Sequence, residues 1–161
     1  MRRYLFFAIS IIILLSSCAT AEENPSERSD SPVLELDSKI LYGILPNGLT
    51  YYIRKNTKPE KRAELRLIVN TGSILEDDHQ RGIAHFLEHL AFNGTLHFKK
   101  DSLVDYIESV GMRFGHDLNA STSYDETIYR LQVPTDEIEK LETGLLILED
   151  WAHNITIEPE E

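Results

Sequence analysis

The chain has 161 residues, of which 42% are hydrophobic, and this is enough for one domain with a hydrophobic core. Its 16 lysines and arginines stand against 27 aspartates and glutamates, for a formal net charge of −11. This balance argues against a nucleic-acid-binding protein, which needs a basic face to neutralise phosphates. A solvated acidic surface explains the charge more simply than a specific attraction for basic substrates.

The first 18 residues predict an export signal. Two arginines precede an apolar run over residues 5–15, which is too short for a membrane span but fits the hydrophobic part of a secretory signal. The run leads into the sequence LSSC, which resembles the lipobox of bacterial lipoproteins, and Cys18 is the only cysteine. We therefore expect a protein anchored through lipidated Cys18 to a membrane of the bacterial cell envelope, facing the periplasm or the outer surface. A plain signal peptide with an incidental cysteine is the alternative.

The next part of the chain predicts a tether and then a folded domain. Residues 19–38 are polar and acidic and contain two prolines, which is typical of a flexible tether. From residue 39 the pattern changes, and apolar runs on both sides of the sequence PNG at 46–48 predict a β-hairpin. Alternating apolar residues at 65, 67 and 69 predict a strand that ends near Gly72. We expect one domain over residues 39–161.

Helical and extended patterns alternate in the rest of the chain. We expect helices over residues 80–92 and 100–110, and a third from about 135 to 154. Two short strands are expected within residues 117–134. The residues predicted to share one side of the second strand are Thr127, Tyr129, Leu131 and Val133, and those predicted to face inward from the last helix are Ile138, Leu141, Leu145 and Leu148. This order of elements predicts an α+β fold.

The sequence HFLEH at residues 85–89 places two histidines and a glutamate within five positions. On a helix, these three side chains fall opposite an apolar stripe that contains Ile83, Phe86, Leu87 and Leu90. Histidines four residues apart can bind one zinc ion, which accepts imidazole nitrogen at about 2.0–2.1 Å and keeps a water in catalytic sites. Glu88 then lies where a general base would take a proton from that water.

An ordinary exposed helix face is the alternative explanation of this motif. The composition of the chain predicts only about 0.02 matches to the pattern H-x-x-E-H by chance. Coincidence is therefore a weak explanation.

The motif has the inverzincin order. Its surroundings, RGIAHFLEHLAFNGT, resemble the pitrilysin/insulinase family of zinc metallopeptidases, which includes the mitochondrial processing peptidases. The segments PNGLTYYI, VNTGSILED and VGMRFGHDLNASTSYDETIYRLQVP resemble, in order, the family's opening hairpin, its first core strand with the following turn, and a later strand pair. The resemblance covers residues 39–161. It implies a mostly antiparallel sheet packed against helices, as in the half domains of insulinase and the processing peptidases.

The resemblance also implies an activity and the residues that carry it. His85 and His89 match the two zinc-binding histidines, and Glu88 matches the general base of a zinc-dependent endopeptidase. Asn119 and Ala120 match the Asn-Ala of an edge strand that, in this family, pairs with an extended peptide substrate. A second homologous domain or subunit is expected to close over the peptide.

One zinc ligand of the family has no match in the chain. It is a glutamate about 75 to 82 residues after the second histidine, which falls beyond Glu161. We therefore expect an incomplete, truncated domain that is inactive by itself. The alternative is a third ligand from inside the chain, for which the candidates are Asp125, Glu126, Glu149 and Asp150.

Two other functions stay open at this point. A non-catalytic peptide-binding subunit of a peptidase complex would use the same fold, although such members tend to lose motif residues and this chain keeps all three. A structural or interaction lipoprotein with a coincidental motif is the other possibility. Tyr129 and Arg130 could touch substrate, but ordinary core and surface positions on a strand explain them more simply.

Overall fold

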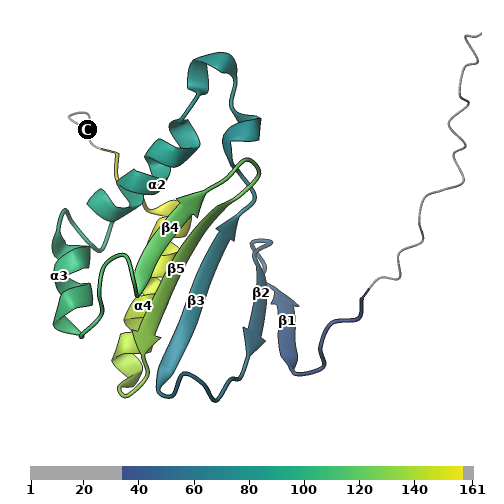
Figure 1. The fold of residues 1–161 in the computed structure, drawn as a ribbon, viewed down its shortest axis with the longest axis vertical. Helices are drawn as coiled ribbons and strands as arrows, with labels where there is room; N and C mark the ends of the chain where they lie inside the picture. Colours follow the sequence, from purple (N-terminus) through teal and green to yellow (C-terminus); the bar gives the residue numbers. More distant parts are fainter. Residues whose placement is uncertain (1–33, 158–161) are drawn as a thin grey trace, which may run out of the picture. The chain divides into compact units, whose positions relative to one another are not determined.

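The computed structural model describes residues 34–157 (Figure 1). The predicted export signal, Cys18 and most of the predicted tether lie outside the described residues. Within residues 34–157, no helix combines the length and the apolar character that crossing a membrane requires. The chain divides into two compact units at Arg54.

The first unit contains the predicted hairpin. Strands β1 (Ile40–Ile44) and β2 (Thr50–Arg54) pair antiparallel, and the turn between them carries the PNG sequence. Gly48 has a φ of 90°, a left-handed conformation that glycine adopts without steric cost. The side chain of Asn47 accepts a hydrogen bond from the backbone N–H of Leu49, as is common for asparagine in turns. The predicted hairpin is confirmed.

The second unit is built on a three-stranded antiparallel sheet. Strands β3 (Arg62–Val69), β4 (Leu118–Thr122) and β5 (Thr127–Pro134) lie in the order β3-β5-β4, which leaves β4 at one edge (Figure 1). Alternation along β5 buries every second side chain, and the four residues predicted to share one side of this strand are all buried. The expected α+β architecture with an antiparallel sheet is confirmed.

Helices follow the predicted order. Two short 3₁₀ turns, η1 (Ser73–Leu75) and η2 (Asp78–Gln80), precede helix α2 (Ile83–Asn93), which is followed by α3 (Ser102–Ser109) and, after the strands, α4 (Ile138–His153). Figure 1 shows α4 behind the sheet and α2 alongside β4. Helix α2 begins three residues later than predicted because Gly82, with a φ of 91°, separates it from η2.

The predicted inward face of α4 is partly wrong. Ile138 and Leu145 are 60% and 53% exposed, whereas Gly144, Ile147 and Trp151 are buried. A Cβ atom at Gly144 would lie 2.9 Å from Val133 Cγ1 and 3.0 Å from Leu65 Cδ1. The absence of a side chain at Gly144 therefore allows α4 to pack closely on the sheet. A prediction based only on large apolar side chains does not identify this face of the helix.

The apolar stripe of α2 is also less buried than its composition suggests. Ile83 and Phe86 are half-exposed, and only Leu90 of the stripe is buried. The buried positions of this helix include Glu88, at 8% exposure, and Ala91. Helix α2 therefore turns the side that carries Glu88 toward the interior, which places this carboxylate against strand β4.

Candidate metal centre

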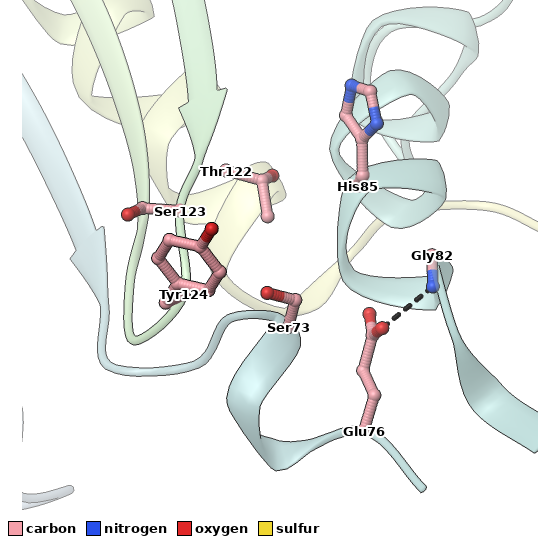
Figure 2. A pocket seen from close by; sticks show the side chains of 7 residues that line it. All are labelled: Ser73, Glu76, Gly82, His85, Thr122, Ser123 and Tyr124. Atoms are coloured by element: carbon pink, nitrogen blue, oxygen red, sulfur yellow. Dashed lines mark hydrogen bonds between the residues drawn. The ribbon is translucent and has the colours of Figure 1, made fainter. Parts of the chain in front are cut away.

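The start of α2 is held by a side chain that lies outside the helix, six to eight residues earlier in the chain. The Glu76 carboxylate accepts a hydrogen bond from the backbone N–H of Gly82, at 2.7 Å (Figure 2), and another from that of Ala84, at 2.8 Å. These bonds satisfy N–H groups that a helix leaves unpaired at its N-terminus, and the negative charge suits the positive end of the helix dipole. The same two bonds lower the pKa of Glu76 from its usual value. Sequence analysis did not identify this contact.

The two motif histidines lie on neighbouring turns of α2 with their rings together. His85 Nε2 and His89 Nε2 are 3.1 Å apart, and both side chains are exposed. Two ligands of a tetrahedral zinc ion at about 2.0–2.1 Å would place their nitrogens about 3.3–3.4 Å apart. The observed separation is close to this value, so the two imidazoles fit a shared zinc ion with little movement.

Glu88 lies between the two histidines in sequence but is far less exposed than either. Its Oε2 atom accepts a hydrogen bond of 2.7 Å from the hydroxyl of Thr122, the last residue of β4. Burial of the Tyr129 side chain raises the pKa of Tyr129 to about 12, and the negative charge of Glu88 contributes less to the same shift. The tyrosine therefore stays neutral near pH 7.

No third ligand accompanies the histidines within residues 34–157, where no group of three or more His, Cys, Asp or Glu side chains could hold a metal ion. The hypothesis that one of the four internal carboxylates completes the site is therefore wrong. Asp150, for example, is fully buried and accepts hydrogen bonds from Thr95, His97 and Asn154.

A cavity opens beside the motif. It measures about 510 Å³ and is bounded on one side by His85 of α2 and on the other by the end of β4 and the turn that follows (Figure 2). Its lining residues are Ser73, Glu76, Gly82, His85, Thr122, Ser123 and Tyr124. His85 thus borders open space, and the side chain of His89 is also exposed, as a site that admits a ligand requires.

The residues predicted to bind substrate lie on β4, at the edge of the sheet. Asn119 is exposed, and its side-chain oxygen accepts a hydrogen bond from the backbone N–H of Ala120. Tyr129, by contrast, is a core residue that stacks on Trp151 with ring centroids 5.2 Å apart. Arg130 is exposed, on the opposite side of β5 from Tyr129.

Fold and motif together define an α+β domain with an inverzincin helix laid against an antiparallel sheet. Residues 51–161 match the family described as Insulinase (Peptidase family M16), and the chain belongs to this family. The resemblance inferred from the sequence is therefore confirmed.

Individual relatives agree with this assignment. The chain is 38% identical over 151 residues to "Probable zinc protease PqqL" of Haemophilus influenzae, covering 94% of this chain and 16% of that protein. It is 41% identical over 125 residues to the protein of the same name from Escherichia coli, covering 78% of this chain and 13% of that protein. The crystal structure of the first half of the periplasmic protease PqqL from Escherichia coli superimposes with a TM-score of 0.76 at 41% identity, over 80% of this chain and 27% of that one. This chain thus spans less than a fifth of the length of these two curated relatives.

Proposed function

We propose that the chain is the N-terminal part of a zinc-dependent endopeptidase, with His85 and His89 as zinc ligands and Glu88 as general base. The observation that carries this proposal is the 3.1 Å approach of the two imidazole nitrogens on the helix that also carries a nearly buried carboxylate. The family and the names of the relatives, which are zinc proteases, support it.

Each residue of the motif has a distinct task in this proposal. His85 and His89 bind through neutral imidazole nitrogen and fix the position of the ion. When bound, zinc polarises the carbonyl of a peptide bond and lowers the pKa of a coordinated water toward about 7. Glu88 accepts the proton of the attacking water, and as a general acid it can pass this proton to the leaving amine.

The third ligand is proposed to be a glutamate that does not belong to the described residues. The family resemblance supports this placement, as does the length of the relatives. We expect residues 34–157 to bind zinc weakly when they are separated from that ligand, and to show little or no turnover.

The substrate is proposed to be a peptide or a small unfolded polypeptide, bound in extended form as an additional strand beside β4. The edge position of β4, with Asn119 and Ala120 beside the metal-binding helix, supports this mode of capture. A second homologous domain or subunit would close over the peptide. This chain covers 14% of the chain in the crystal structure of the periplasmic protease PqqL from Escherichia coli, which leaves ample length for such a domain.

We further propose that the protein is exported and anchored through lipidated Cys18. The relative from Escherichia coli is a periplasmic protease, which supports export. Incorporation of labelled fatty acid into the wild type but not into Cys18→Ser would support the anchor, and equal labelling of both would rule it out.

The experiment that tests the peptidase proposal uses the full-length protein. Glu88→Gln should lower kcat by about 10³-fold or more while zinc content stays at the wild-type level, because the base is lost and the ligands are kept. His85→Ala should lose zinc, whereas His79→Ala, which removes an exposed histidine from η2, should keep both zinc and turnover. Peptide cleavage by Glu88→Gln at the normal rate would show that the base assignment is wrong.

A further inference from the structure

Thr122 makes the contact that fixes the side chain of Glu88. The hydroxyl of Thr122 donates to Glu88 Oε2 at 2.7 Å across 34 residues of sequence, and it is the one hydrogen bond that this carboxylate makes among residues 34–157. One carboxylate oxygen is thereby held, and the other is left for a water molecule. A glutamate side chain has three rotatable bonds, so a fixed Oε2 restricts where the second oxygen can lie.

The position of Thr122 is itself determined by the sheet. It ends β4 opposite Thr127 of β5, and Thr127 in turn donates a hydrogen bond of 2.9 Å to the backbone oxygen of Thr71 after β3. Alternation along β4 turns the side chain of Thr122 to the same side as that of Ala120. The hydroxyl is therefore presented to α2 by a backbone that is tied across all three strands.

Strand β4 thus serves two parts of the proposed reaction. Its edge, at Asn119 and Ala120, is the proposed site of the peptide, and its last residue holds the proposed base. We propose that Thr122 is a positioning residue, whose hydroxyl sets the orientation of Glu88 on the strand that also sets the register of the substrate. This inference rests on the proposed function. A purely structural role, in which Thr122 only satisfies a buried carboxylate, is the competing explanation.

Three variants of the full-length, zinc-loaded protein separate these explanations. Thr122→Val removes the donor and keeps the shape, and it should lower kcat about 10- to 100-fold with KM changed less than threefold and zinc content unchanged. Thr122→Ser keeps the donor and should retain kcat within about threefold of the wild type. Thr143→Val is the matched control: it removes a threonine hydroxyl that donates within α4, to the backbone oxygen of Glu139, so it should leave kcat unchanged.

A readout other than activity comes from the metal-free proteins. Crystal structures should show the Glu88 carboxylate in one orientation in the wild type and in Thr122→Ser, and displaced or in several orientations in Thr122→Val. Thr122→Ala provides the same test should the valine variant not fold.

Several results would overturn this role. Wild-type kcat in Thr122→Val, an equal loss in Thr122→Ser, or an unmoved Glu88 carboxylate would each do so. Failure of the proposed function is distinguishable, because it would show as normal turnover by Glu88→Gln. An inactive Glu88→Gln together with a fully active Thr122→Val would reject the positioning role alone.

Discussion

Two buried carboxylates, Glu88 on α2 and Asp150 on α4, differ in how completely their oxygens are hydrogen-bonded. Asp150 is fully buried, and it accepts hydrogen bonds from Thr95 Oγ1, His97 N and Asn154 Nδ2, while His97 Nδ1 lies 2.8 Å from its Oδ1. Glu88 is 8% exposed and has the single hydrogen bond from Thr122. A carboxylate whose lone pairs are all used has a structural role, whereas one with unused lone pairs, on the helix that also carries two exposed imidazoles, can accept a proton.

The surroundings of Asp150 explain its structural role. It joins α4 to the loop after α2, while the next residue, Trp151, donates a buried hydrogen bond of 3.0 Å to the backbone oxygen of Ala91 on α2. Burial alone would raise the pKa of Asp150, but the hydrogen bonds from Thr95, His97 and Asn154 outweigh it and hold the pKa below its usual value. The pair Asp150-Trp151 thus secures the C-terminal end of α2, the helix of the proposed metal site.

The largest expected effect on stability is that of Asp150→Asn. The amide keeps the shape of the side chain but loses its charge, and its NH2 group points at groups that are themselves donors. The free energy of unfolding should therefore fall by about 3 kcal/mol. Hydrogen exchange of α4 in the full-length protein measures this as a loss of protection of roughly 10²-fold. Asp136→Asn, which changes an exposed carboxylate just before α4, is the control and should leave exchange unchanged. Equal protection in Asp150→Asn and the wild type would contradict the structural role.

Acidification should reproduce part of that loss. The pKa of Asp150 is lower in the folded protein than in the unfolded chain. Its contribution to the free energy of unfolding is therefore complete above the pKa in the unfolded chain, about 3.9. It is lost as the pH falls through that value toward the lower folded one. The difference in thermal midpoint between the wild type and Asp150→Asn should therefore shrink as the pH falls from 6 to 3. A difference that grows on acidification would contradict the lowered pKa.

The smallest expected effect on stability is that of Glu88→Gln in the metal-free protein. The amide oxygen can still accept the hydrogen bond of Thr122, and the cost of burying a charge beside Tyr129 is removed. We expect an unchanged or slightly higher thermal midpoint, a change of about 0–1 kcal/mol, although turnover is lost. A loss of stability as large as that of Asp150→Asn would show that Glu88 has the same structural role as Asp150.

Local patterns in the sequence predicted much of this fold. Alternation identified the buried side of β5, and the PNG turn identified the β1-β2 hairpin. Each of these features depends on neighbours within a few residues, which is the range that periodicity and turn preferences report.

The remaining features depend on contacts between distant residues. The inward face of α4 was predicted wrongly because Gly144 lies on it. This glycine lets the helix approach the sheet closely but adds no apolar side chain to the pattern. The hydrogen bonds of Glu76 to the start of α2, of Thr122 to Glu88 and of Thr95 to Asp150 join segments that are 6 to 55 residues apart. Period-two alternation from Ala120 places Thr122 on the helix side of β4, but only the packing of α2 brings Glu88 within reach.

The central claim is that His85 and His89 hold one zinc ion with the carboxylate of Glu88 beside it. Anomalous diffraction from crystals of the zinc-loaded full-length protein, recorded on both sides of the zinc absorption edge, tests it most directly. A single strong peak is expected about 2.0–2.1 Å from Nε2 of each histidine. A peak bound elsewhere, with the two imidazole rings turned away from each other, would contradict it.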